Sequence, residues 1–157
     1  LKPFFSYLET GEKGLFALVA TSNPGASDIE GILAANGESV SEKTGAMIQD
    51  LGKAFSGNCG YSSIGAVVGC TNHEQTVSIR PRLASTFFLI PGYGAQGGKA
   101  GDIKDYLQDG NGGGVNSSRG IRLAYQKPEY SGMTFAEAAR AECISMRDAI
   151  RSAAVHL

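Results

Sequence analysis

The chain has 157 residues, of which 14 are basic and 15 acidic, so that its formal net charge is −1, and 42% of its residues are hydrophobic. This length suits one domain built around a single core, which we place over residues 1–157. The even charge balance disfavours nucleic acid as a partner, and the absence of a long apolar run disfavours a membrane segment.

Four predicted strands alternate with helical segments along the chain. Residues 15–20 form an unbroken apolar run, which predicts a strand buried on both faces. Ser41 is the expected N-cap of the helix that follows, and Gly57 its expected end. The predicted strands are 15–20, 64–69, 86–90 and 113–118, and the predicted helices are 1–8, 41–55, 74–83, 102–107, a stretch opened by 119–121, and a last helix capped by Thr134 and ending near Ala154.

This alternation predicts an α/β fold with parallel strands. Either an open doubly wound sheet or one half of a closed (β/α)8 TIM barrel fits the pattern. Periodicity alone leaves both architectures open.

The 22 glycines are about twice the usual share of roughly 7%, and they cluster at turns. The densest cluster is residues 91–98, directly after the third predicted strand, where Gly92, Gly94 and Gly97 match the dinucleotide-binding pattern G-x-G-x-x-G. The match is weak, because the motif follows the third strand and no helix begins directly after it. A phosphate-binding loop at the carboxyl end of a barrel is the favoured interpretation.

The two last predicted strands would each present phosphate-binding groups at their ends. Gln96 comes from the glycine turn, and Ser117, Ser118 and Arg119 follow the fourth strand. Main-chain N–H groups freed by glycine and a bidentate arginine are typical phosphate ligands. Taken singly, the glycines could form a merely flexible turn and Arg119 could pair with a surface carboxylate.

These two motifs, read as PGYGAQGG and VNSSRGI, resemble the orotidine 5′-phosphate decarboxylase family in its longer bacterial, type 2 subfamily. ATSNPG after the first strand, GAVVGCT at the second and FAEAAR in the last helix also match, in the family's order. The resemblance implies a TIM barrel of which this chain supplies the last four β/α units, as the C-terminal half. It also implies a homodimer that converts orotidine 5′-phosphate (OMP) to UMP and CO2 in pyrimidine biosynthesis, with no metal or cofactor. The cysteine pattern separately favours a cytoplasmic, reducing setting.

The resemblance assigns the phosphate to four residues. Gln96 would lie on a closing loop and bridge the phosphate and the pyrimidine. Arg119 would grip the phosphate with its side chain, assisted by main-chain N–H groups near Ser118 and Gly120.

The same resemblance assigns the binding of the pyrimidine to two further residues. Ser22 would bond its edge, and Pro91 would lie against the base. Without the resemblance, Ser22 would be taken as a simple turn residue of a Thr-Ser-Asn-Pro loop.

The catalytic residues of the family are not expected in this chain. The family's Asp-x-Lys-x-x-Asp motif is absent, and Asp102-Ile103-Lys104-Asp105 is interpreted as the start of a solvated helix. We therefore expect no decarboxylase activity from residues 1–157 alone, whose half-barrel would expose two sheet edges.

Neither His73 nor His156 has a partner motif, and both are expected to face solvent, so no metal site is predicted. The three cysteines, Cys59, Cys70 and Cys143, lack metal-binding spacing and are expected to be reduced thiols, Cys70 and Cys143 being buried. Two other functions stay open: another phosphate-binding TIM-barrel lyase or isomerase, and a phosphate-binding module without catalysis.

Overall fold

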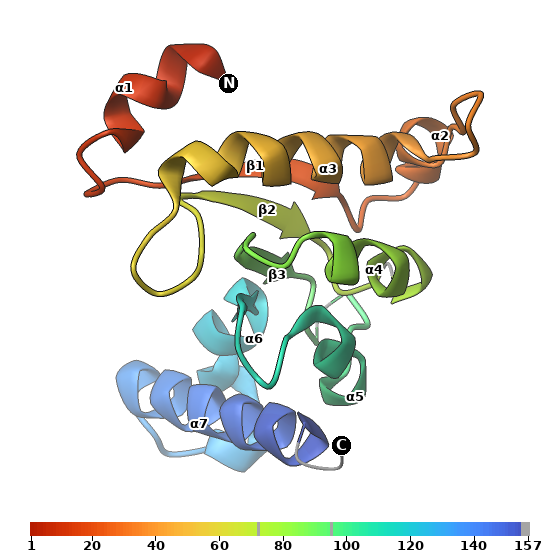
Figure 1. The fold of residues 1–157 in the computed structure, drawn as a ribbon. Coiled ribbons are helices and arrows are strands. Elements are labelled where there is room, and N and C mark those ends of the chain that lie inside the picture. Colours follow the sequence, from red (N-terminus) through yellow and green to blue (C-terminus); the bar gives the residue numbers. More distant parts are fainter. Residues whose placement is uncertain (72, 95, 155–157) are drawn as a thin grey trace.

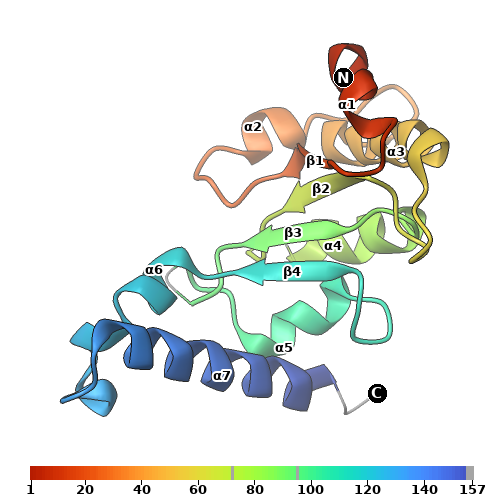
Figure 2. The ribbon, with the colours of Figure 1, turned by 90° about the vertical axis from the view of Figure 1, so that its left-hand side faces the viewer.

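Four parallel strands form one sheet in the same order as in the sequence (Figures 1 and 2). The computed structural model describes residues 1–71, 73–94 and 96–154, without the side chains of residues 73–75. A doubly wound sheet contains a point where the strand order reverses, whereas successive units of a barrel always add to the same side. The order found here is that of a barrel segment. The strands are β1 (Leu15–Ala20), β2 (Ile64–Val68), β3 (Phe88–Pro91) and β4 (Gly113–Asn116).

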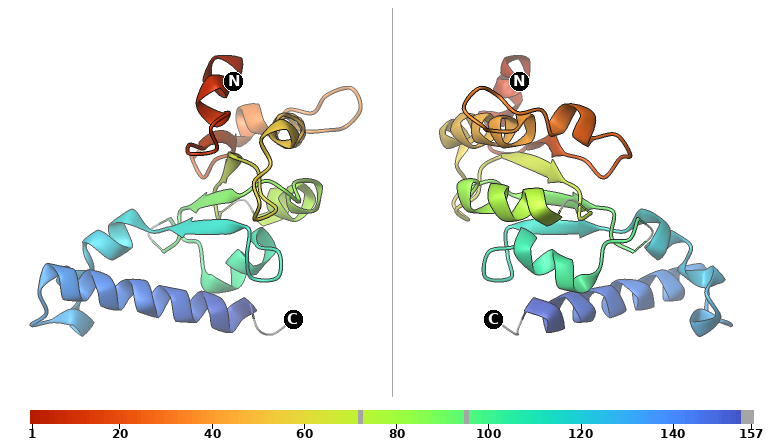
Figure 3. Two further views of the ribbon diagram at one scale, coloured as in Figure 1. Left: turned by 60° about the vertical axis from the view of Figure 1, so that its left-hand side comes forward. Right: turned by 90° about the vertical axis from the view of Figure 1, so that its right-hand side faces the viewer.

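Helices connect the strands and cover one face of the sheet. Helix α3 packs on β1 and β2, whereas α5 and α6 pack on α7, which runs along the β4 side of the molecule (Figure 3). The helices are α1 (Phe5–Leu8), α2 (Ser27–Glu30), α3 (Val40–Gly52), α4 (His73–Ile79), α5 (Ala100–Ile103), α6 (Ser118–Arg122) and α7 (Phe135–Ala154). Short 3₁₀ turns occupy Lys2–Phe4, Lys53–Phe55, Arg80–Arg82, Lys104–Tyr106, Ala124–Gln126 and Pro128–Tyr130.

Burial alternates along β1, and this corrects one prediction. Val19 is buried under the helices, but Phe16 and Leu18 on the other face are 49% and 65% exposed. The prediction that this strand is buried on both faces is therefore wrong for the part of the chain that the structure describes. The run is apolar on both faces, but only one of them is covered. Such a second apolar face is what the interior of a closed barrel would bury.

The N-cap of the first long helix lies two residues before its expected position. Ser39 is the N-cap of α3: its hydroxyl accepts from the Glu42 N–H at 3.2 Å, and the Glu42 carboxylate accepts from the Ser39 N–H at 2.9 Å. These bonds hold the pKa of Glu42 below its usual value, and the bond from the Ser39 N–H has the largest effect. Ser41 is instead fully buried inside the helix, so its prediction as the cap is wrong. The Ser39-x-x-Glu42 capping box was the stronger signal.

The other predicted elements are present with shifted ends. The Gly57 N–H bonds the Tyr61 carbonyl at 2.8 Å, so Gly57 opens the next turn, while α3 already ends at Gly52. Thr134 does cap α7, because its hydroxyl accepts from the Glu137 N–H at 3.3 Å. None of the described helices combines the length and the apolar character that crossing a bilayer requires.

Candidate functional site

The carboxyl ends of all four strands meet at one edge of the sheet, where ligands of parallel sheets bind. Ser22 follows β1, Cys70 follows β2, Pro91 ends β3 and Asn116 ends β4. The edge therefore collects the motifs that are scattered along the sequence.

The glycine turn after β3 folds back on itself. The Gly94 N–H donates to the Gly98 carbonyl at 2.9 Å, and the Gly97 N–H donates to the Gly94 carbonyl at 2.9 Å. Gly92, Gly94 and Gly97 have φ angles of +101°, +73° and +97°, which side chains of L-residues rarely permit. Glycine at these positions makes the tight loop possible.

A small pocket of about 160 Å³ opens between this loop and the start of α6. Four of the predicted substrate-binding residues line it, namely Pro91, Gln96, Ser118 and Arg119, together with Gly92, Tyr93, Asn116 and Ser117. The Arg119 guanidinium makes no ion pair or hydrogen bond with any residue that the structure describes. It is exposed and available to an anion. Gly120, the remaining residue predicted at the phosphate, is next in α6 but does not line the pocket.

Ser22 and Gln96 approach each other across Gly92, although they lie far apart in the sequence. A Cβ atom on Gly92 would lie 3.3 Å from Ser22 Oγ and 2.7 Å from Gln96 Oε1. Ser22 Oγ is buried and has no hydrogen-bond partner among the described residues. A buried hydroxyl without a partner is costly unless a ligand satisfies it. Ser22 thus lies beside the pocket and next to a residue of its lining.

The loop that carries Ser22 is held by a carboxylate. Glu30 of α2 accepts from the Thr21 N–H at 2.9 Å and from the Thr21 hydroxyl at 2.9 Å. Neither α2 nor the bonds between Thr21 and Glu30 were predicted from the sequence. A four-residue helix leaves almost no periodic signal, but an acidic residue downstream of a Thr-Ser loop could have suggested it.

Cys70 lies beneath the glycine turn. Its side chain is 1% exposed, and a Cβ atom on Gly92 would lie 3.2 Å from its Sγ, while one on Gly98 would overlap it. Burial raises the pKa of this thiol to about 11. Cys70 is therefore a protonated packing residue and not a nucleophile. Cys59 and Cys143 are exposed, so the expectation that Cys143 is buried in its helix is wrong, because it lies on the outer side of α7.

We expect thiol reagents to separate these three cysteines. At pH 8 the folded protein should be alkylated by iodoacetamide at Cys59 and Cys143, whereas Cys70 should react at least tenfold more slowly, because it is buried and its pKa lies well above 8. Peptide mass spectrometry of time points measures the three rates, and guanidinium-unfolded protein is the control. Equal rates in the folded protein would contradict the packing under the turn.

Ser117 stands at the N-cap position of α6 but does not cap it. Its carbonyl accepts the Ile121 N–H at 3.0 Å, while its hydroxyl donates to the Tyr93 carbonyl at 3.0 Å. The side chain is 5% exposed. Ser117 was predicted among the possible phosphate ligands. In the structure its hydroxyl instead joins the glycine turn to the loop before α6.

The acid–lysine pair after the glycine turn has a structural role. Asp102 accepts from the Lys99 N–H at 2.8 Å and so caps α5. Lys104 is exposed. The described residues contain no group of three His, Cys, Asp or Glu side chains arranged to hold a metal ion. The side chain of His73 and all of His156 lie outside the described residues.

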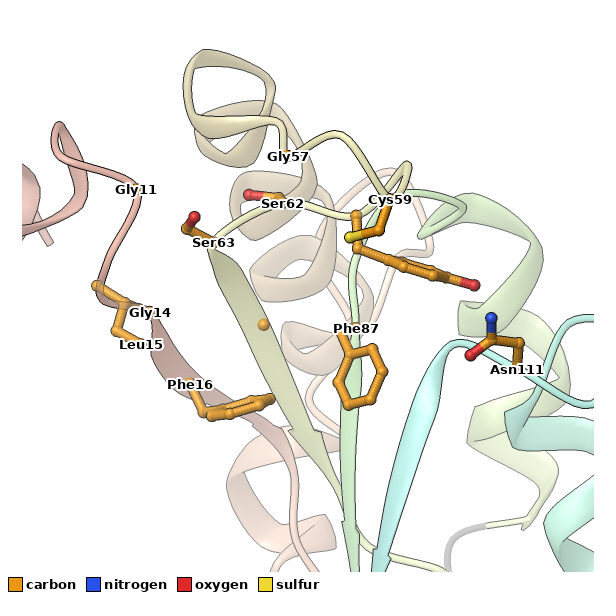
Figure 4. A pocket seen from close by; sticks show the side chains of 12 residues that line it. Gly11, Gly14, Leu15, Phe16, Gly57, Cys59, Ser62, Ser63, Phe87 and Asn111 are labelled. Carbon is orange, nitrogen blue, oxygen red and sulfur yellow. The ribbon is translucent and has the colours of Figure 1, made fainter.

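A larger pocket of about 510 Å³ lies at the opposite, amino-terminal ends of the strands (Figure 4). Phe87 packs edge-on against Phe16 and Tyr61, with ring centroids 6.5 and 5.7 Å apart. None of the described residues lining it is charged. It lacks the anion-binding groups of the smaller pocket and is a weaker candidate for a phosphate compound.

Comparisons with known proteins agree on one family. The family model described as "Orotidine 5'-phosphate decarboxylase / HUMPS family" matches residues 1–132. The chain is 54% identical over 153 residues to orotidine 5′-phosphate decarboxylase of Clostridium tetani and 54% identical over 151 residues to that of Clostridium acetobutylicum. These alignments cover 98% and 96% of this chain and 53% of each relative. The chain thus spans about half the length of the curated relatives it matches.

Solved structures give the same fold. UMP synthase of Leishmania donovani superposes with a TM-score of 0.71 at 28% identity, over 96% of this chain and 30% of that one. OMP decarboxylase of the same organism superposes with a TM-score of 0.67 at 23% identity, over 94% of this chain and 52% of that one. The predicted barrel segment is confirmed.

Proposed function

The chain belongs to the orotidine 5′-phosphate decarboxylase / HUMPS family, and we propose that it forms the phosphate- and pyrimidine-binding half of an orotidine 5′-phosphate decarboxylase. The observation that carries this proposal is the convergence of Gln96, Ser118 and Arg119 on one pocket, with the buried Ser22 hydroxyl beside it. The first group suits a phosphate, and the second supplies an uncharged hydrogen-bonding group for a base.

In this proposal Arg119 binds the phosphate through its guanidinium, and N–H groups at Ser118 and Gly120 complete the phosphate site. Gln96 reaches from the glycine turn toward both the phosphate and the pyrimidine. Ser22 bonds the pyrimidine edge, and Pro91 packs against the ring. The neighbouring Cys70 thiol, with its raised pKa, takes no part in proton transfer at neutral pH.

The contribution of these residues to the reaction is remote binding energy. Decarboxylation of OMP breaks the bond between the carboxylate and C6 of the ring, far from the phosphate. Contacts to the phosphate can still lower the barrier when they hold a loop closed over the ring and exclude water. The glycine turn, flanked by both binding groups, is suited to this closure.

The bond-breaking groups are not among the residues that we propose for the site. Asp102 is occupied as a helix cap and Lys104 is exposed, so neither offers the family's Asp/Lys network. We propose that no residue of 1–157 acts catalytically, that the reaction needs no metal or cofactor, and that the protein works as a cytoplasmic homodimer without nucleic acid or membrane partners.

Ligand discrimination tests the proposal against a sugar-phosphate lyase or isomerase of the same fold. In the protein at the length its organism produces, we expect UMP to bind at least tenfold more tightly than ribose 5-phosphate, because only UMP engages Ser22 and Gln96 with a base. Isothermal titration calorimetry measures both dissociation constants. Equal affinities would favour the sugar-phosphate alternative, and UMP binding without OMP turnover would favour a binding module.

A further inference from the structure

The Ser117 side chain is buried and joins the two loops of the phosphate pocket by a hydrogen bond. Its hydroxyl donates to the Tyr93 carbonyl at 3.0 Å, at the base of the glycine turn, while its main chain begins α6. Because Ser117 is 5% exposed, water competes little for this bond. From this geometry we infer that Ser117 is a positioning residue that fixes the glycine turn relative to Arg119, and so sets the geometry of the phosphate grip.

The choice of partner is informative. A serine at an N-cap ordinarily accepts a hydrogen bond from an N–H of its own helix. Ser117 makes no such cap bond. Its hydroxyl is turned to the neighbouring loop instead, so its bond fixes the position of that loop and not the start of its own helix.

The packing around Ser117 leaves little room for another arrangement. A Cβ atom on Gly120 would lie 2.5 Å from Ser117 Oγ, and one on Gly94 would lie 3.7 Å from it. Gly120 thus admits the hydroxyl from the side of α6, and Gly94 faces it from the glycine turn. The bond to Tyr93 is enclosed by both loops that it connects.

This inference rests on the proposed function, because it concerns how the phosphate of that substrate is held. A positioning role at the phosphate makes a specific demand. Loss of the Ser117 hydroxyl should matter for a substrate that carries the phosphate and should not matter for the same substrate without it. A role in fold stability alone would affect both substrates equally.

The test is the variant Ser117→Ala in the protein at the length its organism produces, assayed with OMP and with orotidine, its phosphate-free nucleoside. We expect kcat/KM for OMP to fall roughly threefold to tenfold, the range that one buried hydrogen bond supports. The value for orotidine should stay within about twofold of the wild type.

Ser62→Ala is the matched control. Ser62 is also a buried serine, and its hydroxyl accepts the Ile64 N–H at 2.9 Å, but it lies at the amino ends of the strands. The Ser62→Ala variant should leave the ratio of kcat/KM for OMP to kcat/KM for orotidine unchanged. An unchanged OMP value in Ser117→Ala, or equal losses for both substrates, would overturn the inference. If the wild type itself does not decarboxylate OMP, the proposed function fails instead.

Discussion

Replacing Arg119 with alanine is expected to lower kcat/KM for OMP by about a hundredfold to a thousandfold, in the protein at the length its organism produces. Arg119 lines the pocket that we propose for the phosphate, and its guanidinium has no ion pair or hydrogen bond with any residue that the structure describes. Hydrogen bonds to charged groups contribute about 1.5–3 kcal/mol each, and a bidentate contact supplies two. Since about 1.4 kcal/mol corresponds to a factor of ten, the loss should reach at least two orders of magnitude.

Two further variants sharpen this expectation. Arg119→Lys keeps the charge but loses the bidentate geometry, and should fall between the wild type and alanine. Arg151→Ala removes an exposed arginine from the last turn of α7, away from the pocket, and should change kcat/KM by less than about twofold. Thermal unfolding of Arg119→Ala should match the wild type, because an exposed side chain without partners contributes little to stability. If Arg119→Ala and Arg151→Ala behaved alike, Arg119 would have no place in the phosphate site.

The order of elements was predictable because parallel strands and their helices leave different periodic patterns. All four strands appear near their predicted positions, and their ends shift by only a few residues. The hydrophobic periodicity did not distinguish a doubly wound sheet from a barrel segment. That distinction depends on which strands pair, and pairing is a long-range property that local patterns do not record.

The site was predictable where glycine and arginine motifs fall at strand ends. Gln96 and Arg119 were identified from such motifs, and they do line one pocket. The contacts that hold the loops of the candidate site were not predicted, because each of them joins separate segments of the sequence. The Ser117–Tyr93 bond spans 24 positions and the Thr21–Glu30 bonds span nine. A serine at a helix start predicts a cap, and only the fold shows that its hydroxyl turns elsewhere.

A polypeptide of residues 1–157 alone is expected to form no UMP from OMP. In the proposed function the pocket residues bind and orient the substrate, but no Asp or Lys is among the described residues that line the pocket. The acid–lysine pair that follows the glycine turn is not the family's Asp/Lys network, because Asp102 bonds the Lys99 N–H at 2.8 Å and Lys104 is exposed. A spectrophotometric assay of OMP consumption, with chromatography of the products, measures this. The control is the protein at the length its organism produces, assayed in parallel.

The exposed face of the sheet gives the same expectation an independent physical basis. Phe16 and Leu18 are 49% and 65% exposed on the face that a closed barrel would enclose. With this face open, water reaches the interior that a closed barrel would enclose, and the low dielectric that would strengthen polar contacts there is lost. Binding through Arg119 can therefore survive in part while turnover is absent. UMP formation that rises in proportion to the concentration of the 1–157 polypeptide would contradict this expectation. It would show that these residues contain a catalytic group that neither the sequence motifs nor the structure reveals.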